Sequence, residues 1–206
     1  MEMPRHQPRP SPKRDAVLDA AQACFLELGF AATSMDLVAA GAGVSKATIY
    51  AHFVGKEDLF SAVIHRRCGG DLWAAEAWPL EGGARVTLTA AATRLMELMT
   101  APDTLAMYRV VIAEAARQPD LARAFWEAGP GQGKARLSAV FEDLSRRGDL
   151  DTPDPWAAAD QFAGMLRAEI FHSTLLGLPS PEGRSAEATI AAAVETILRA
   201  YGRKGV

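Results

Sequence analysis

The chain has 206 residues and a net charge of −3, with 49% hydrophobic and 23% charged residues. This balance is ordinary for a globular protein with a sizeable core, and the small net charge neither favours nor excludes a nucleic-acid partner. No segment reaches the roughly 18 apolar residues of a membrane span, and the N-terminus lacks the apolar segment of a secretory signal. We therefore expect a cytoplasmic protein with no membrane partner.

The chain begins with "MEMPRHQPRPSPKR", a proline-rich stretch with four lysine or arginine residues and one glutamate. We interpret residues 1–13 as a basic disordered tail, which is either a solvated leader or an arm along an anionic partner. Neither Cys24 nor Cys68 has the CxxC spacing of a metal site, so we expect reduced thiols and no metal or cofactor.

Prolines divide the rest of the chain into segments that have the character of helices. None occurs between Pro12 and Pro79, and the later ones are widely spaced; proline is poorly tolerated inside a helix. Alanine is abundant, and no run shows the alternation and β-branched enrichment of a strand. The sequence therefore predicts an all-α fold.

The first long interval is divided by its glycines. Residues 17–28 carry an apolar stripe that includes Cys24, and Gly29 suits the C-terminal cap of that helix. The stretch "TSMD" then predicts the start of a short helix, with Thr33 or Ser34 and Asp36 as a capping box.

A second short helix follows the glycine turn "GAG". Ser45 is its predicted N-cap, and it extends to about His52, before a longer helix at about residues 57–67. Two short helices joined by a tight turn and held between longer ones match the helix-turn-helix pattern.

The second short helix has small and hydrogen-bonding side chains on its outer flank. A helix reads DNA when its side chains reach base edges in the major groove and its ends donate to phosphates. Val44, Ile49 and Phe53 are predicted to face inward and hold this helix. The segment predicts a DNA-recognition unit; the alternative is an ordinary short helix with a solvated polar face. The candidate DNA-contacting residues on it and just after it are Ser45, Lys46, Ala47, Thr48, Tyr50, His52 and Lys56.

Residues 16–64 strongly resemble the DNA-binding domain of the TetR family of bacterial transcription regulators. The matching pieces occur in order: "GF", "TSMD", "AGVSKATIY", "HF" and "KEDLF". The resemblance implies a homodimer whose recognition helices enter successive major grooves of an operator. It also implies a three-helix DNA-binding domain over residues 14–60 and a larger helical ligand-binding and dimerisation domain over residues 61–206. By position it implies phosphate contacts from Thr33, Ser34, Lys46, Thr48, Tyr50, His52 and Lys56, and places Ser45, Lys46, Ala47 and Tyr50 nearest the bases.

Two residues depart from the family's pattern. Ala47 stands where many members have glycine, which should alter the approach to the bases only slightly. Gly41 lies late in the first short helix and favours a helix less than the usual residue, so we expect that end to fray.

Longer helices are expected beyond Pro79, and part of this region resembles a known subgroup. The stretch "MYRVVIAEAARQPDLARAFWEAGP" resembles the C-terminal domain of AefR-like regulators, which does not identify a ligand. A long helix is predicted from "TPDPW" to about Leu178 and a last one after "SAEAT". The family's arrangement implies that these two helices form a four-helix bundle with those of a second copy. The candidate dimer-interface residues are Leu166, Ile170, Ile190, Val194, Ile197 and Tyr201.

Methionine and aromatic side chains of the C-terminal region could line a ligand pocket, because such side chains adapt to apolar ligands. The same spacing also suits plain core, and that alternative stays open. The candidate pocket residues are Met96, Met99, Met107, Tyr108, Val111, Phe125, Phe162, Met165 and Glu169, with Trp126 beside them.

Two further patterns carry less weight. "GPGQGK" has one residue too few for a phosphate-binding loop and lacks the serine or threonine after Lys134, so we interpret it as a helix break or flexible joint. Glu169 and His172 share a helix face, but they supply only two ligands where zinc needs at least three. They are also the acid–base pair that an enzyme in the helical pocket would need.

The sequence as a whole predicts a transcriptional regulator that is not an enzyme. The most specific hypothesis is a repressor that binds a palindromic operator as a dimer and is released by a small apolar or amphipathic effector. An activator, or a regulator that answers a protein partner, is the closest alternative.

Overall fold

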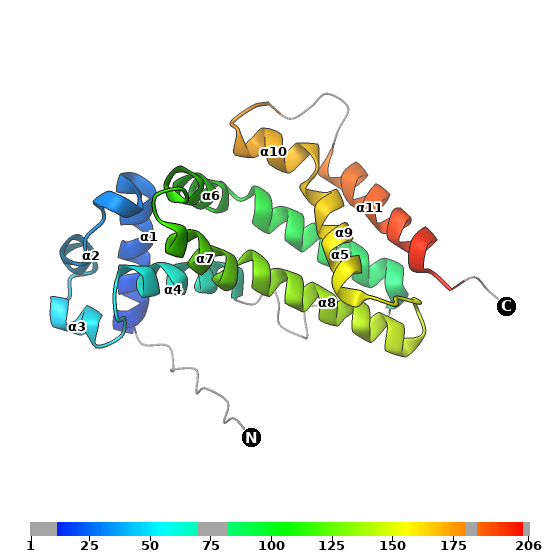
Figure 1. Cartoon of the computed structure of the whole chain (residues 1–206), viewed down its shortest axis with the longest axis horizontal. Helices are drawn as coiled ribbons and strands as arrows, with labels where there is room; N and C mark the ends of the chain where they lie inside the picture. The colour runs from blue at the N-terminus through cyan, green and yellow to red at the C-terminus, as the bar shows by residue number, and fades with distance from the viewer. Residues whose placement is uncertain (1–11, 70–81, 180–184, 204–206) are drawn as a thin grey trace, which may run out of the picture.

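The computed structural model describes residues 12–69, 82–179 and 185–203, so most of the predicted basic tail lies outside the described residues. Within these ranges the chain forms eleven α-helices and no strand, which confirms the all-α prediction. The helices are α1 (Pro12–Ala32), α2 (Met35–Ala42), α3 (Lys46–Tyr50), α4 (Lys56–Gly69), α5 (Gly83–Thr100), α6 (Pro102–Glu114), α7 (Pro119–Ala128), α8 (Pro130–Arg147), α9 (Pro155–Arg167), α10 (Glu169–Leu175) and α11 (Ala186–Tyr201). Figure 1 shows α2 and α3 at one end of the molecule and α11 toward the opposite end.

The two short helices each begin at a serine cap, as predicted. Ser34 Oγ accepts a hydrogen bond from the backbone N–H of Leu37 at 3.2 Å, and Ser45 Oγ accepts one from Thr48 at 3.1 Å. Between them Gly43 takes a left-handed conformation, with φ 64°, and its N–H donates to the end of α2. Glycine adopts this conformation without the steric cost of a side chain, so it can turn the chain sharply between α2 and α3.

Gly41 does not fray the end of α2, and that expectation is wrong. The helix continues through Ala42, and a Cβ atom at position 41 would lie 3.4 Å from the Cβ of Ala20 on α1. A side chain there would make an ordinary contact with α1, so the packing of α2 on α1 does not require glycine at this position.

Gly29 interrupts α1 with φ 79°, which places the predicted C-cap glycine at a kink before the last turn of that helix. The stripe predicted on α1 is buried only in part, because Leu28 is 49% exposed and Cys24 is half-buried. Burial, with a smaller contribution from Glu27, raises the pKa of the Cys24 thiol.

The core of the helix-turn-helix continues into the C-terminal region. Phe25, Phe30 and Phe60 pack with ring centroids 5.2 to 5.6 Å apart. The same cluster of buried side chains includes Met107 of α6 and Phe125 of α7. Moreover, the boundary predicted at residue 60 falls inside α4. The DNA-binding helices are thus packed directly against the helices that follow.

The structure corrects one prediction for the C-terminal helices and decides between the two alternatives of another. The segment from "TPDPW" is not one helix to Leu178, because the backbone leaves the helical region at Ala168, with φ −39° and ψ −128°, and separates α9 from α10. "GPGQGK" contains a helix break, the first of its two predicted alternatives, and is not a flexible joint. The break is confined to Gly129, and α8 begins at Pro130, which suits the first position of a helix because proline has no N–H to donate.

Candidate functional site

Most of the predicted DNA-contacting side chains lie on the surface of α2 and α3. Ser34, Ser45, Lys46, Ala47 and His52 are exposed. Tyr50 is half-exposed and projects from the last turn of α3. Ile49 and Phe53 are buried, as predicted, and hold α3 against the rest of the domain. Val44 and Thr48 are half-buried, and the Thr48 and Ser45 hydroxyls lie 2.8 Å apart. The exposed flank of α3 can therefore approach a duplex without rearrangement of the core.

Lys46 has a carboxylate partner that the sequence did not reveal. Its Nζ lies 2.8 Å from Oδ1 of Asp36, and both side chains are more than half exposed. The hydrogen bond to Asp36, with the charge of that group, raises the pKa of Lys46. Asp36 therefore connects α2 to α3 instead of completing the predicted capping box at Ser34.

Thr33 and Lys56 are turned into the fold. Thr33 is 2% exposed, and its hydroxyl donates to the carbonyl oxygen of Gly29 at 2.8 Å. Lys56 Nζ donates to the carbonyl oxygens of Phe30, Ala31 and Thr33 at 2.7, 3.2 and 2.9 Å, and lies 4.5 Å from the centre of the Phe30 ring. Lys56 thus caps the end of α1 and holds the turn into α2, and its phosphate contact stays a prediction.

A cavity of about 60 Å³ lies where α4 to α9 meet. Four predicted pocket residues line it, together with Trp126, while Val111 and Phe162 lie in the core away from its lining. Met96 faces a groove between α5 and α11, and Met165 and Glu169 face another between α9–α10 and α11. The predicted residues at the cavity are Met99, Met107, Tyr108 and Phe125.

The charged lining of this cavity was not predicted. Arg67, Lys134, Asp160 and Arg167 all contribute to its wall. Of these four residues, only Lys134 was singled out in the sequence, as the lysine of "GPGQGK", and it was not assigned to a pocket. Asp160 and Arg167 lie seven residues apart on α9 and so share a face, but only the packing of six helices reveals that this face borders the cavity.

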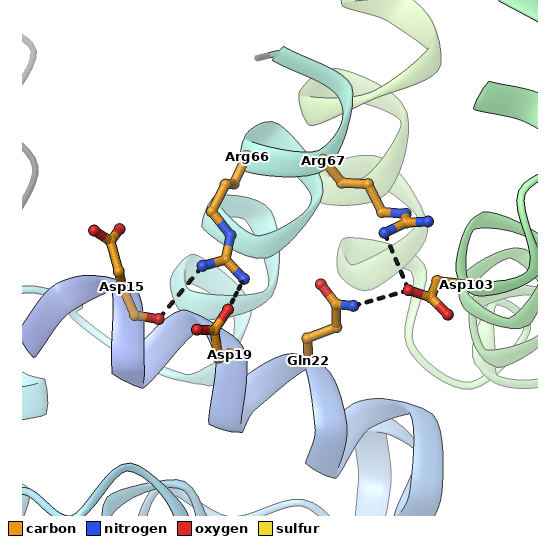
Figure 2. A network of polar contacts seen from close by, with 6 residues as sticks. All are labelled: Asp15, Asp19, Gln22, Arg66, Arg67 and Asp103. Atoms are coloured by element: carbon orange, nitrogen blue, oxygen red, sulfur yellow. Dashed lines mark hydrogen bonds and ion pairs between the residues drawn. The ribbon is translucent and has the colours of Figure 1, made fainter. Parts of the chain in front are cut away.

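Polar contacts connect the cavity to the DNA-binding helices (Figure 2). Arg67 lines the cavity, and its Nη1 lies 3.2 Å from Oδ2 of Asp103 on α6. The same oxygen accepts a hydrogen bond from Gln22 of α1 at 3.3 Å. Next to Arg67, Arg66 joins α4 to α1 through Asp19 at 2.7 Å and the carbonyl oxygen of Asp15 at 3.3 Å. These contacts connect α1, α4 and α6 beside the cavity.

The predicted dimer-interface residues lie mainly inside a single chain. Five of the six are at most 9% exposed and belong to the C-terminal core: Leu166, Ile170, Ile190, Val194 and Ile197. Tyr201 is half-buried, and its hydroxyl donates to Gln161 at 2.8 Å. These side chains leave little surface for a second copy, because they already fill the space between α11 and its neighbours.

Glu169 and His172 lie on α10, outside the cavity. Nδ1 of His172 is 2.6 Å from the carbonyl oxygen of Ala168, so this ring nitrogen is engaged with its own helix. The pair is therefore separated from the cavity where an enzyme would need it.

Taken together, the fold and its exposed helix-turn-helix define a DNA-binding transcription regulator. The model for "Bacterial regulatory proteins, tetR family" matches residues 17–63, and the model for "AefR-like transcriptional repressor, C-terminal domain" matches residues 86–203. The second match alone covers more than half of the chain. The chain belongs to the TetR family.

Several known proteins are similar to the chain. A solved structure, the flavonoid-responsive regulator FrrA, is 36% identical with a TM-score of 0.76, over 94% of this chain and 98% of that one. The HTH-type regulator YhgD of Bacillus subtilis is 45% identical over 51 residues, and the activator FasR of Mycolicibacterium smegmatis is 43% identical over 54. These matches cover 25% and 26% of this chain, and it spans only 27% and 25% of the length of those two curated relatives. Because its relatives are transcriptional regulators, the chain is not an enzyme.

No helix of the described residues is both long enough and apolar enough to cross a membrane.

Proposed function

We propose that the protein is a ligand-responsive repressor that binds a palindromic operator as a homodimer in the cytoplasm. A small apolar or amphipathic effector in the cavity releases it from DNA. One observation carries this proposal: Arg67 lines the cavity and also belongs to the contacts that join α1, α4 and α6. The name of FrrA, which describes response to a flavonoid, supports an effector with an aromatic skeleton.

Operator recognition depends on the spacing of two copies of α3. These must lie about 34–36 Å apart to enter successive major grooves on one face of the duplex. Exposed Lys46, Tyr50 and His52 are the proposed contacts, with the Lys46 ammonium shared between Asp36 and a phosphate. Each phosphate neutralised by a cation releases counterions, so binding should weaken steeply with salt.

The proposed dimer face is the outer side of α11 with α10. Ala188, Ala192 and Thr196 are exposed there and line a groove with Met165 and Ala168. Small side chains let helices from two copies approach closely, as a four-helix bundle requires. The face lies on the same helices as the residues predicted from the sequence, but on their solvent-facing side.

An effector releases the protein from its operator only if it binds the released state of the dimer more tightly than the DNA-bound state. An effector that expands the cavity pushes α4 and α6 apart and so favours a dimer with a different spacing of its α3 helices. It can weaken operator binding only by its preference for that state, typically about 1–3 kcal/mol, or roughly 5- to 150-fold.

The proposal is tested by binding to DNA from upstream of the protein's own gene, against scrambled DNA of equal length, over a range of salt concentrations. We expect tight binding to the native fragment alone, with a steep loss as salt rises. Equal binding to both fragments at every salt concentration would contradict a sequence-specific repressor of its own operator. The same assay then screens for effectors.

An activator is the second candidate, because FasR is named as one and is similar over the DNA-binding segment. Deletion of the gene distinguishes the two functions. Transcripts of the controlled genes rise in the deletion strain for a repressor and fall for an activator.

A further inference from the structure

We propose that the effector is an aromatic anion whose acidic group binds Arg167. The inference rests on the proposed function and adds the chemical class of ligand that this cavity selects. Two observations support it: the charged residues that line the cavity, and the ion pairs that some of them already form with other protein groups.

Cationic groups outnumber anionic ones around the cavity. Arg67, Lys134 and Arg167 line it, against the single carboxylate of Asp160. Lys134 forms an ion pair with that carboxylate, since its Nζ lies 3.0 Å from Asp160 Oδ1. The same Nζ lies 4.7 Å from the centre of the Trp156 ring. Arg67 is paired outside the lining, with Asp103. Two of the three cations are therefore already neutralised by protein groups.

Arg167 is the cation that remains. Over residues 12–69, 82–179 and 185–203, no hydrogen bond or ion pair joins its guanidinium to another group. It is half-buried at the last position of α9, two helical turns from Asp160 on the same face. A guanidinium stays charged at any physiological pH, and its parallel N–H groups fit a carboxylate or other oxyanion. A ligand oxyanion would supply the missing partner.

The rest of the wall selects a flat ring system. Tyr108 and Phe125 meet edge to face, with ring centroids 4.8 Å apart, and Trp126 lies beside them. Met99 and Met107 complete this apolar side, and methionine sulfur packs favourably against aromatic rings. The cavity of about 60 Å³ is smaller than the roughly 150 Å³ of an apolar cavity that holds benzene, so a ring system must widen it on binding, and a thin planar molecule requires less widening than a bulky one. The ring thus lies among these side chains while its oxyanion reaches Arg167.

The test compares 2-naphthoate with 2-naphthamide, which have the same ring and nearly the same shape but differ in charge. Binding to the full-length protein is measured by isothermal titration calorimetry, for the wild type and for Arg167→Gln, Arg167→Lys and Arg123→Gln. Arg123 is an exposed arginine on α7 that does not line the cavity, and its variant controls for the loss of one positive charge.

We expect the wild type to prefer the naphthoate. Arg167→Gln should weaken naphthoate binding roughly 10- to 100-fold, which is the usual effect of losing a charged hydrogen bond. Arg167→Lys should retain part of the preference, because it keeps the charge and loses only the fork of N–H groups. Arg123→Gln should bind both compounds as the wild type does. Unchanged naphthamide binding in Arg167→Gln confirms that the cavity is intact.

Three results would overturn the inference. They are equal affinity of the wild type for both compounds, undiminished naphthoate binding in Arg167→Gln, and no binding of naphthoate at millimolar concentration. Operator binding measured in parallel keeps the two proposals apart. Release of the operator by the neutral amide alone would support the repressor and refute the anion, whereas Arg167-dependent naphthoate binding without any operator binding would refute the repressor.

Discussion

Arg67 and Asp103 form an ion pair, with 3.2 Å between Nη1 and Oδ2, that connects the wall of the cavity to α6. Because Asp103 also accepts a hydrogen bond from Gln22 of α1, one carboxylate is shared between α4 and the first helix of the DNA-binding domain. A ligand that contacts Arg67 therefore acts on a group one contact away from α1.

This pair should contribute modestly to stability. Arg67 and Asp103 are 26% and 48% exposed, and pairs with this exposure typically contribute about 0.2–1 kcal/mol. We expect Arg67→Gln and Asp103→Asn each to lower the free energy of unfolding by about 1 kcal/mol or less. In urea denaturation the double variant should be destabilised by less than the sum of the two single effects, because both substitutions remove the same interaction. Strictly additive effects would show that the two residues are not coupled.

Lys46 and Lys56 should have separable roles, although both belong to the same helix-turn-helix. Lys46→Met should weaken operator binding and lower the magnitude of the salt slope by about 0.9 for each phosphate that the lysine neutralises in the wild type. It should barely change stability, because its pair with Asp36 is exposed. The measurement is fluorescence anisotropy on an operator fragment at several salt concentrations.

Lys56→Met is the matched comparison. It removes three hydrogen bonds to carbonyl oxygens at the end of α1, so the free energy of unfolding should fall by about 1–3 kcal/mol. Thermal or urea denaturation measures this decrease. If Lys56→Met is as stable as the wild type and affects only the salt slope, the capping role is wrong and Lys56 is a phosphate contact.

The two glycines at the end of α2 should respond differently to alanine. Gly43→Ala places a side chain at φ 64°, and we expect the free energy of unfolding to fall by about 1 kcal/mol. Gly41→Ala adds a Cβ at ordinary contact distance from Ala20, and alanine favours a helix interior by up to about 1 kcal/mol over glycine. The Gly41 variant should therefore be at least as stable as the wild type in denaturation. A larger destabilisation by Gly41→Ala than by Gly43→Ala would show that α1 and α2 leave no room for a side chain at position 41.

A substitution at the proposed dimer face should change the oligomeric state of the protein. Ala192→Glu places two like charges and extra volume where the proposed interface brings copies of α11 together, so the dimer should dissociate at micromolar concentration. Sedimentation velocity or light scattering measures the mass in solution. Ala40→Glu, on the exposed surface of α2, is the control and should remain dimeric. A dimeric Ala192→Glu would move the interface away from this face of α11.

The helix-turn-helix could be predicted from the sequence because its signals are local. An N-cap serine accepts a hydrogen bond from a backbone N–H two or three residues later, so the cap is recognised within one helical turn. A glycine just after a helix indicates a left-handed turn, because it has no side chain to oppose that conformation, and apolar residues at helical spacing indicate the buried face. Ser34, Ser45, Gly43 and Ile49 all have their predicted roles in the structure. Such features need only a few neighbouring residues, so the order of amino acids determines them directly.

The tertiary structure decided three other features: the partners of Lys46 and Lys56, the buried side of α11, and the charged wall of the cavity. Apolar residues at helical spacing indicate a buried face, but burial against the same chain and burial against a second copy leave the same pattern, which is why Ile190 and Val194 were assigned to an interface. Lys56 meets carbonyl groups 23 to 26 residues away, and Arg167 reaches a cavity bounded by six helices. Contacts of this kind depend on how helices pack, and the sequence periodicity of any one helix contains no record of its neighbours.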